Sequence, residues 1–167
     1  MTVSGINKMD TKVKKEVKLL VAENNKNGES LVCQNLRRAG IRNAIVQFKS
    51  SSELMDFLFP ARGIEDSGVI CSYLLLLELN GIAGAELDVL RRLKTEAGTK
   101  KVSVIIITAQ KDSDVVAECR ELGYTNYLEK PIVYESLLEV LRKVGLFLMI
   151  VDIPVIKFDR DSETEGK

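Results

Sequence analysis

Histidine is absent from this chain of 167 residues. The absence excludes a Ser-His or Cys-His catalytic pair, a histidine metal site and a phosphohistidine donor within the chain. Any phosphoryl group used here would have to arrive from another molecule. Cysteine is scarce, and Cys33, Cys71 and Cys119 lie far apart, so no paired spacing indicates a metal knuckle or a redox motif.

Net charge and long apolar runs are also missing. Lysine and arginine together number 24, as do aspartate and glutamate, so no overall field favours nucleic acid or an anionic membrane. No apolar stretch reaches membrane-spanning length, and the start of the chain, residues 1–18, is polar and dotted with lysine, unlike a signal segment. We therefore expect a cytoplasmic protein that binds neither membranes nor nucleic acid directly.

Apolar runs of strand length alternate with segments of helical period, which is typical of successive β–α units around a parallel sheet. The pattern predicts an α/β domain over residues 17–148, preceded by a lead-in over residues 1–16 and followed by an apolar arm and polar tail over residues 149–167. The predicted strands cover residues 17–21, 44–48, 69–77, 102–107 and 126–129. The predicted helices cover residues 28–38, 52–58, 86–94, 113–122 and 134–148.

Several residues have the character of helix boundaries. Gly40 and Gly123 follow helical segments and suit C-terminal stops, whereas Ser52 and Ser113 precede helical segments and suit N-caps. Apolar spacing in the last helix predicts which side chains face the core. This inner stripe consists of Leu137, Leu138, Leu141 and Val144.

Four polar residues occupy the carboxyl ends of four different predicted strands. They are Glu23, Glu78, Thr108 and Lys130. Any one of them alone would be read as an exposed loop residue, because charged side chains usually lie in water. In open α/β sheets, however, ligands gather beyond the carboxyl ends of the strands at the topological switch point, so we expect these four side chains to converge on one pocket.

Four segments resemble the signature segments of response-regulator receiver domains: residues 19–24, 75–80, 106–109 and 127–131. Each segment is weak alone, but their order and spacing are specific. The resemblance implies a flavodoxin-like, three-layer αβα fold with a doubly wound five-stranded parallel sheet of order 2-1-3-4-5. Residues 146–154 are further similar to the tails of stand-alone receivers that serve bacterial phytochromes.

The resemblance also implies roles for single residues. In the family, an acidic pair after the first strand, the acceptor aspartate and a main-chain carbonyl two residues later hold Mg²⁺; these positions fall on Glu23, Glu78 and Asn80. Thr108 matches the hydroxyl that meets the phosphoryl group, and Lys130 matches the lysine that pairs with it, before a characteristically cis Lys-Pro bond. Tyr127 matches the aromatic residue whose rotamer accompanies switching.

Two departures from the family pattern concern the acceptor site. Ala22 stands where one carboxylate of the acidic pair belongs, so Mg²⁺ should bind weakly or not at all, because this ion tolerates poor octahedral geometry badly. Glu78 stands where the acceptor aspartate belongs, and its extra methylene moves the carboxylate out by about 1.5 Å. Since a displacement of about 1 Å can cost on the order of 10²-fold in rate, we expect a degenerate site with no catalytic residue. We also expect Glu78 to pair with Lys130.

The sequence thus favours a stand-alone receiver that is not an enzyme and acts as an interaction module, with a histidine kinase or a downstream target as partner. Output is expected at the face formed by the fourth helix, fifth strand and fifth helix. The apolar arm, residues 151–158, packs either on its own domain or across a second subunit of a homodimer. The alternative is a receiver that still accepts phosphate. A small-molecule-binding flavodoxin-like protein is disfavoured, because no glycine-rich fingerprint follows the first strand.

Overall fold

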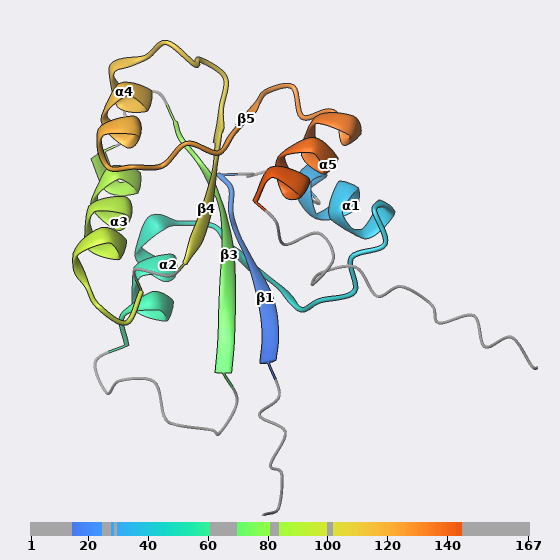
Figure 1. The fold of residues 1–167 in the computed structure, drawn as a ribbon, viewed down its shortest axis with the longest axis horizontal. Helices are drawn as coiled ribbons and strands as arrows, with labels where there is room; N and C mark the ends of the chain where they lie inside the picture. Colours follow the sequence, from blue (N-terminus) through green and yellow to red (C-terminus); the bar gives the residue numbers. More distant parts are fainter. Residues whose placement is uncertain are drawn as a thin grey trace, which may run out of the picture.

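Five strands and five helices alternate along the computed structural model, which describes residues 15–24, 28, 30–60, 70–80, 84–99 and 102–144 (Figure 1). The strands are β1 (Lys15–Ala22), β2 (Ile45–Phe48), β3 (Ile70–Glu78), β4 (Ser103–Thr108) and β5 (Tyr127–Glu129). The helices are α1 (Leu31–Arg38), α2 (Ser51–Leu58), α3 (Gly84–Thr95), α4 (Asp114–Glu121) and α5 (Tyr134–Lys143). The predicted number, type and order of these elements are confirmed.

All strand pairings are parallel, and the strand order is β2-β1-β3-β4-β5, as expected for a flavodoxin-like sheet. The chain crosses from β2 over β1 to β3, so the topological switch point lies between β1 and β3. The register pairs Ala22 with Leu77, and Glu78 with Ile107. The carboxyl ends of β1, β3 and β4 therefore reach the same edge of the sheet.

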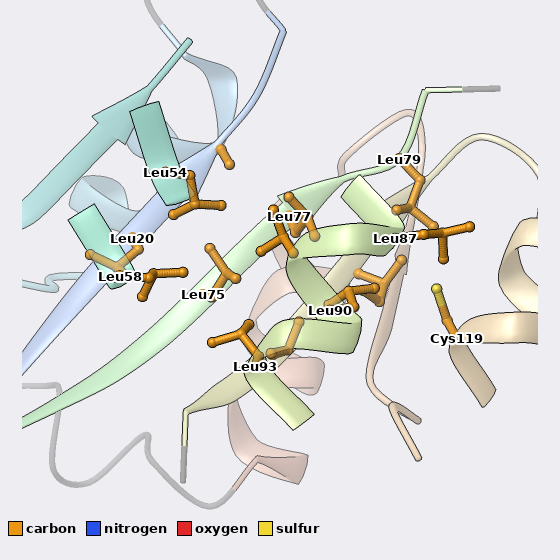
Figure 2. Close-up of a cluster of buried hydrophobic side chains, with 14 of the residues drawn as sticks. Leu20, Leu54, Leu58, Leu75, Leu77, Leu79, Leu87, Leu90, Leu93 and Cys119 are labelled. Atoms are coloured by element: carbon orange, nitrogen blue, oxygen red, sulfur yellow. The ribbon is translucent and has the colours of Figure 1, made fainter. Parts of the chain in front are cut away.

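Helices cover both faces of the sheet. Figure 1 shows α1 and α5 on one side and α2, α3 and α4 on the other. Alternate residues of β3 point to opposite faces, so Leu76 packs with the α1 and α5 side chains and Leu77 with those of α2, α3 and α4. This two-sided burial explains why β3 contains four consecutive leucines, residues 74–77, instead of alternating apolar and polar side chains. Figure 2 shows the cluster beneath α2, α3 and α4.

The predicted stops and one predicted cap are confirmed. Gly40 and Gly123 have φ angles of +83° and +89°, a left-handed backbone conformation that glycine adopts without a steric penalty. At the start of α4, the Ser113 hydroxyl accepts a hydrogen bond from the main-chain N–H of Val116 at 3.3 Å. These residues end α1 and bound α4, and so set the entry of the chain into β2 and β5.

The predicted N-cap of α2 is wrong by two residues. Ser50, not Ser52, is the cap: its hydroxyl accepts from the main-chain N–H of Glu53 at 3.2 Å. The Glu53 carboxylate reaches back to the main-chain N–H of Lys49 at 3.0 Å. Ser50 is preferred because it stands three residues before a glutamate, the spacing of a capping box, whereas Ser52 directly precedes Glu53.

Two other helix predictions need correction. Helix α1 begins at Leu31 with Ser30 as its N-cap, and Gly28, the predicted start, has a non-helical φ of +137°. In α5, the buried residue of the central turn is Val140, whereas Leu138, predicted to face the core, is only half-buried. The lead-in, the 61–69 and 81–83 segments, the end predicted for α5 and the arm and tail after residue 144 lie outside the described residues.

Candidate functional site

Glu78 ends β3 and lies at the centre of the site. Its side chain is only 8% exposed, although a glutamate carboxylate is strongly hydrated in water. Two groups compensate for this burial: Lys130 Nζ forms an ion pair with Glu78 Oε1, and the main-chain N–H of Asn24 donates to Glu78 Oε2 at 3.2 Å. Both carboxylate oxygens are therefore engaged, one by a neighbour that follows β1 and one by a neighbour that follows β5.

Lys130 is positioned by its main chain. Its N–H donates to the carbonyl of Thr108 at 2.9 Å, which continues the pairing between β4 and β5 by one residue. The following bond, Lys130–Pro131, is cis. The Lys130 side chain is 35% exposed, so its ammonium group keeps part of its hydration while it contacts Glu78. The expected ion pair between Glu78 and Lys130 is present.

Glu23 follows β1 and is held by the start of α1. The Ser30 hydroxyl donates to Glu23 Oε2 and also accepts from the main-chain N–H of Cys33 at 3.1 Å, which caps α1. One serine thus links the helix N-terminus to the acidic residue after β1. A carboxylate near the first turn of a helix is favoured, because the unsatisfied N–H groups there carry partial positive charge.

A hollow of about 190 Å³ lies between the ends of β1, β2 and β3. Its wall includes Ala22, Glu23, Glu78, Asn80 and Glu86. Where a second carboxylate of the acidic pair would project, Ala22 offers only a methyl group. Of the two carboxylates expected to bind metal, Glu78 is already paired with Lys130 and Glu23 with the Ser30 hydroxyl.

The donor set does not fit Mg²⁺. No three acidic or cysteine side chains in the described part of the chain are grouped as metal ligands would be. Magnesium requires nearly ideal octahedral geometry from oxygen ligands, and an alanine methyl group supplies none. Asn80 lines the hollow, but a single carbonyl cannot replace the missing carboxylate.

Thr108 ends β4 and is buried, with 4% of its surface exposed. Its hydroxyl donates to the main-chain carbonyl of Gln110 at 3.1 Å and accepts from the main-chain N–H of Gln110, also at 3.1 Å. Thr108 and Asn80 also line a second hollow of about 160 Å³. The Thr108 hydroxyl is therefore engaged by its own loop, beside the ion pair of Glu78 but hydrogen-bonded elsewhere.

Tyr127 begins β5 and packs partly buried against the cluster beneath α2, α3 and α4. Its hydroxyl donates to the main-chain carbonyl of Tyr124, and the Arg120 guanidinium lies over its ring at 5.4 Å from the centroid. Burial raises the pKa of the Tyr127 phenol above its ordinary value. The ring is thus held between the core and a cation from α4.

The four predicted residues reach the same edge of the sheet, but the prediction that they converge on one pocket is wrong: Glu23 and Glu78 line the first hollow, Thr108 lines the second, and Lys130 joins them through its ion pair with Glu78. Sequence reasoning missed three partners: the main-chain N–H of Asn24, the Ser30 hydroxyl and the main chain of Gln110. Only Ser30 had a recognisable signal, because a serine just before a helix is a typical N-cap. Main-chain groups in loops leave no trace in residue type.

None of the helices in the described part of the chain has the length and hydrophobicity needed to cross a bilayer. A comparison with curated proteins found no match. Similar solved structures exist. A bacteriophytochrome response regulator, RtBRR, is 21% identical and aligns with a TM-score of 0.65 over 82% of this chain and 82% of its own.

Two further structures show the same fold. A response regulator receiver domain from Rhodospirillum rubrum is 26% identical, with a TM-score of 0.61 over 82% of this chain and 96% of its own. The chemotaxis response regulator CheY4 of Vibrio cholerae is 18% identical, with a TM-score of 0.59 over 77% of this chain and 98% of its own.

The family model of the response regulator receiver domain matches residues 19–142, which include the carboxyl ends of all five described strands. Members of this family are modules of two-component signalling and not enzymes, and they contact histidine kinases or downstream targets. The chain therefore belongs to the response regulator receiver domain family.

Proposed function

We propose that this receiver does not take up phosphate and works as a protein-interaction module in two-component signalling. The observation that carries the proposal is the state of Glu78, which stands where the family has its acceptor aspartate. Its carboxylate is buried, and both of its oxygens are engaged, by Lys130 and by the main chain of Asn24. An in-line attack on a phosphodonor requires a carboxylate oxygen that can leave such partners and align with the incoming phosphorus.

The surroundings of Glu78 support the same conclusion. Ala22 offers no metal ligand, and the two carboxylates that the family resemblance assigns to the metal, Glu23 and Glu78, already have partners. Phosphoryl transfer depends on a metal ion or cationic side chains to neutralise the developing charge. Lys130 is the cation that contacts Glu78, and it is therefore already paired with a carboxylate. The Thr108 hydroxyl, which would have to meet a phosphoryl oxygen, is bonded to Gln110.

The ion pair also bears on switching. The Glu78 carboxylate lies against Lys130, where the family would bring a phosphoryl oxygen, but it carries a single charge and two oxygens. A phosphoryl group carries close to two charges and three strong acceptor oxygens. We therefore propose a loss of phosphate-dependent switching, and not permanent activation. The signal would pass through protein contacts that do not depend on a phosphodonor. The stand-alone character, the homodimer and the cytoplasmic location expected from the sequence stay predictions.

A phosphorylation experiment tests the proposal directly. The chain is incubated with acetyl phosphate and Mg²⁺, and its intact mass is measured over time. We expect no added phosphoryl group, because acceptor displacement alone costs on the order of 10²-fold in rate and the metal is poorly held. A gain of one phosphoryl group that is lost in the Glu78→Gln variant would contradict the proposal and favour the phosphorylation-competent alternative.

The matched variant restores both ligands. In the Ala22→Asp, Glu78→Asp double variant, the acidic pair is complete and the acceptor has the length found in the family. We expect this variant to gain one phosphoryl group in a Mg²⁺-dependent manner, because the sheet that positions the two strand ends is unchanged. Failure of the double variant to react would show that the scaffold, and not only the two side chains, has departed from a working site.

A further inference from the structure

A third hollow, with positively charged residues in its wall, lies between α4, β5 and α5 at the β5 edge of the sheet. It has a volume of about 220 Å³. Its charged wall residues are Lys111 from the loop before α4, Arg120 from α4 and Lys143 from α5. None of the described residues that line this hollow is a carboxylate, in contrast to the hollow beside Glu78. The chemistry therefore suits an anionic occupant.

The cations of this hollow are available to a competing anion. Lys111 pairs with Glu129 at 2.7 Å and Lys143 pairs with Glu139 at 2.8 Å, but all four side chains are at least half exposed. Exposed ion pairs of this kind contribute little, because water and salt screen them. The Arg120 guanidinium lies over the Tyr127 ring at 5.4 Å from the centroid, and the Arg120 side chain is exposed to solvent.

Carboxylates on the neighbouring helices do not supply the anion that would occupy this hollow. On α4, Glu118 is bonded to Arg91 of α3, and on α5, Glu139 is bonded to Lys143. Glu121 is exposed at the end of α4. With Lys111 offset by Glu129 and Lys143 by Glu139, the charge of Arg120 remains over the hollow.

The chain itself carries a segment of complementary charge. Residues 159–165 place a carboxylate at every second position, with Asp159, Asp161, Glu163 and Glu165 as the four. Side chains two residues apart point the same way in an extended backbone, so one side of an extended segment would carry all four carboxylates. A helix would scatter them around its axis. An extended segment also suits the outer edge of β5, which pairs only with β4 in the described sheet.

The connection is long enough for the segment to return to its own domain. Helix α5 ends at Lys143, which is itself part of the wall of the hollow, and fifteen residues separate Lys143 from Asp159. Fully extended, they span up to about 50 Å, which exceeds the length of α5 several-fold. A tether of this length also gives a high effective concentration of the segment at the hollow.

We propose that residues 159–165 bind across the hollow between α4, β5 and α5 of the same chain, with their carboxylates on Lys111, Arg120 and Lys143. The contact covers the face on which output was expected, so a partner that uses this face must displace the segment. Only this consequence for signalling rests on the proposed function. The contact itself depends on charge and reach, and it stands whether or not Glu78 accepts phosphate.

Hydrogen exchange on the full chain tests the contact. The four carboxylates of the segment are removed by the substitutions Asp159→Asn, Asp161→Asn, Glu163→Gln and Glu165→Gln, while Arg160 is kept. We expect amides of residues 125–129 and 140–143 to exchange faster than in the wild type by roughly 3-fold or more, because individually weak ion pairs add through the tether. Raising the salt concentration should bring the wild type to the same rates. A matched control, Ser162→Ala with Thr164→Ala, keeps every charge and should exchange like the wild type.

A second variant changes the hollow and leaves the acidic segment intact. Arg120→Gln with Lys143→Gln removes two exposed cations and should speed exchange at residues 125–129 even when the segment is intact. A control at the opposite edge of the sheet, Lys49→Gln, should have no effect there. Unchanged exchange after removal of the four carboxylates would overturn the proposal. So would protection that rises with protein concentration, which would assign the contact to a second copy, or a change confined to β1, which would assign it to the lysine-rich lead-in.

Discussion

Glu78 differs from the other described glutamates that pair with lysine because its side chain is buried. The Glu78 side chain is 8% exposed beside Lys130, whereas the Glu139 side chain is 67% exposed beside Lys143. In the exposed pair, the hydrogen bond from Lys143 lowers the pKa of Glu139, but water can replace this partner when the pair breaks. In the buried pair, removal of one charge leaves the other poorly solvated, which is the expensive case.

This contrast predicts different costs for the same substitution. Glu78→Gln should lower the free energy of unfolding by about 1–3 kcal/mol, below the full cost of breaking a buried pair because Lys130 keeps partial access to water. Glu139→Gln, the matched control, should leave the urea midpoint unchanged within error. Both values come from urea denaturation at neutral pH. Equal midpoints for the two variants would mean that Glu78 and Lys130 form no more than a surface pair.

Serine N-caps start three of the five helices. Ser30, Ser50 and Ser113 each accept a hydrogen bond from a main-chain N–H in the first turn of α1, α2 and α4. Each cap satisfies a donor that the helix itself cannot satisfy. Ser30 also links two elements, because its hydroxyl donates to Glu23 and so connects the start of α1 with the acidic residue that follows β1.

The cap of α2 can be tested within one run of serines. Ser50→Ala should cost about 1 kcal/mol, because the main-chain N–H of Glu53 loses its acceptor. Ser52→Ala is the control: the residue is exposed inside the first turn of α2, and its loss should change stability by less than about 0.5 kcal/mol. Thermal or urea unfolding of the two variants gives the comparison. A larger loss for Ser52 would restore it as the cap.

For the whole molecule, the sheet is covered on both sides. Leu76 and Leu77 are neighbours on β3, are 0% and 1% exposed, and belong to the core clusters on opposite faces. The cluster with Leu76 contains side chains of α1 and α5, and the cluster with Leu77 contains side chains of α2, α3 and α4. Neither layer of helices could be lost without exposing one side of the central strand.

Two-sided burial predicts equal sensitivity at adjacent positions. Leu76→Ala and Leu77→Ala should each destabilise the fold by about 2–5 kcal/mol, since each removes buried methyl groups and leaves a cavity. In a sheet with one face in water, only one of the two substitutions would destabilise the fold to this extent. Ser72→Ala on the same strand is exposed and should have an effect below about 0.5 kcal/mol. Urea denaturation of the three variants would contradict this picture if either leucine proved tolerant.

The success of sequence reasoning differed between elements for physical reasons. Strand β3 was predictable because an almost uninterrupted apolar segment of strand length is typical of a central parallel strand. The stops at Gly40 and Gly123 were predictable because a positive φ favours glycine. The cap of α2 was misplaced because Ser50 and Ser52 have the same chemistry. Leu138 was predicted to face the core in place of Val140, because both residues are apolar and only the way α5 lies on the sheet decides which one is buried.

By itself, the amino-acid sequence determined the order of strands and helices, the two-sided core, and the presence of alanine and glutamate where the family has aspartates, because apolar periodicity and residue type are local properties. Only the tertiary structure decided which partner each polar group at the sheet edge finds. The pair of Glu78 with Lys130 was expected, but the second partner of Glu78, the main-chain N–H of Asn24 54 positions away, and the choice of Gln110 as the partner of Thr108 were not. Those choices depend on distances that exist only once parallel strands have aligned their carboxyl ends.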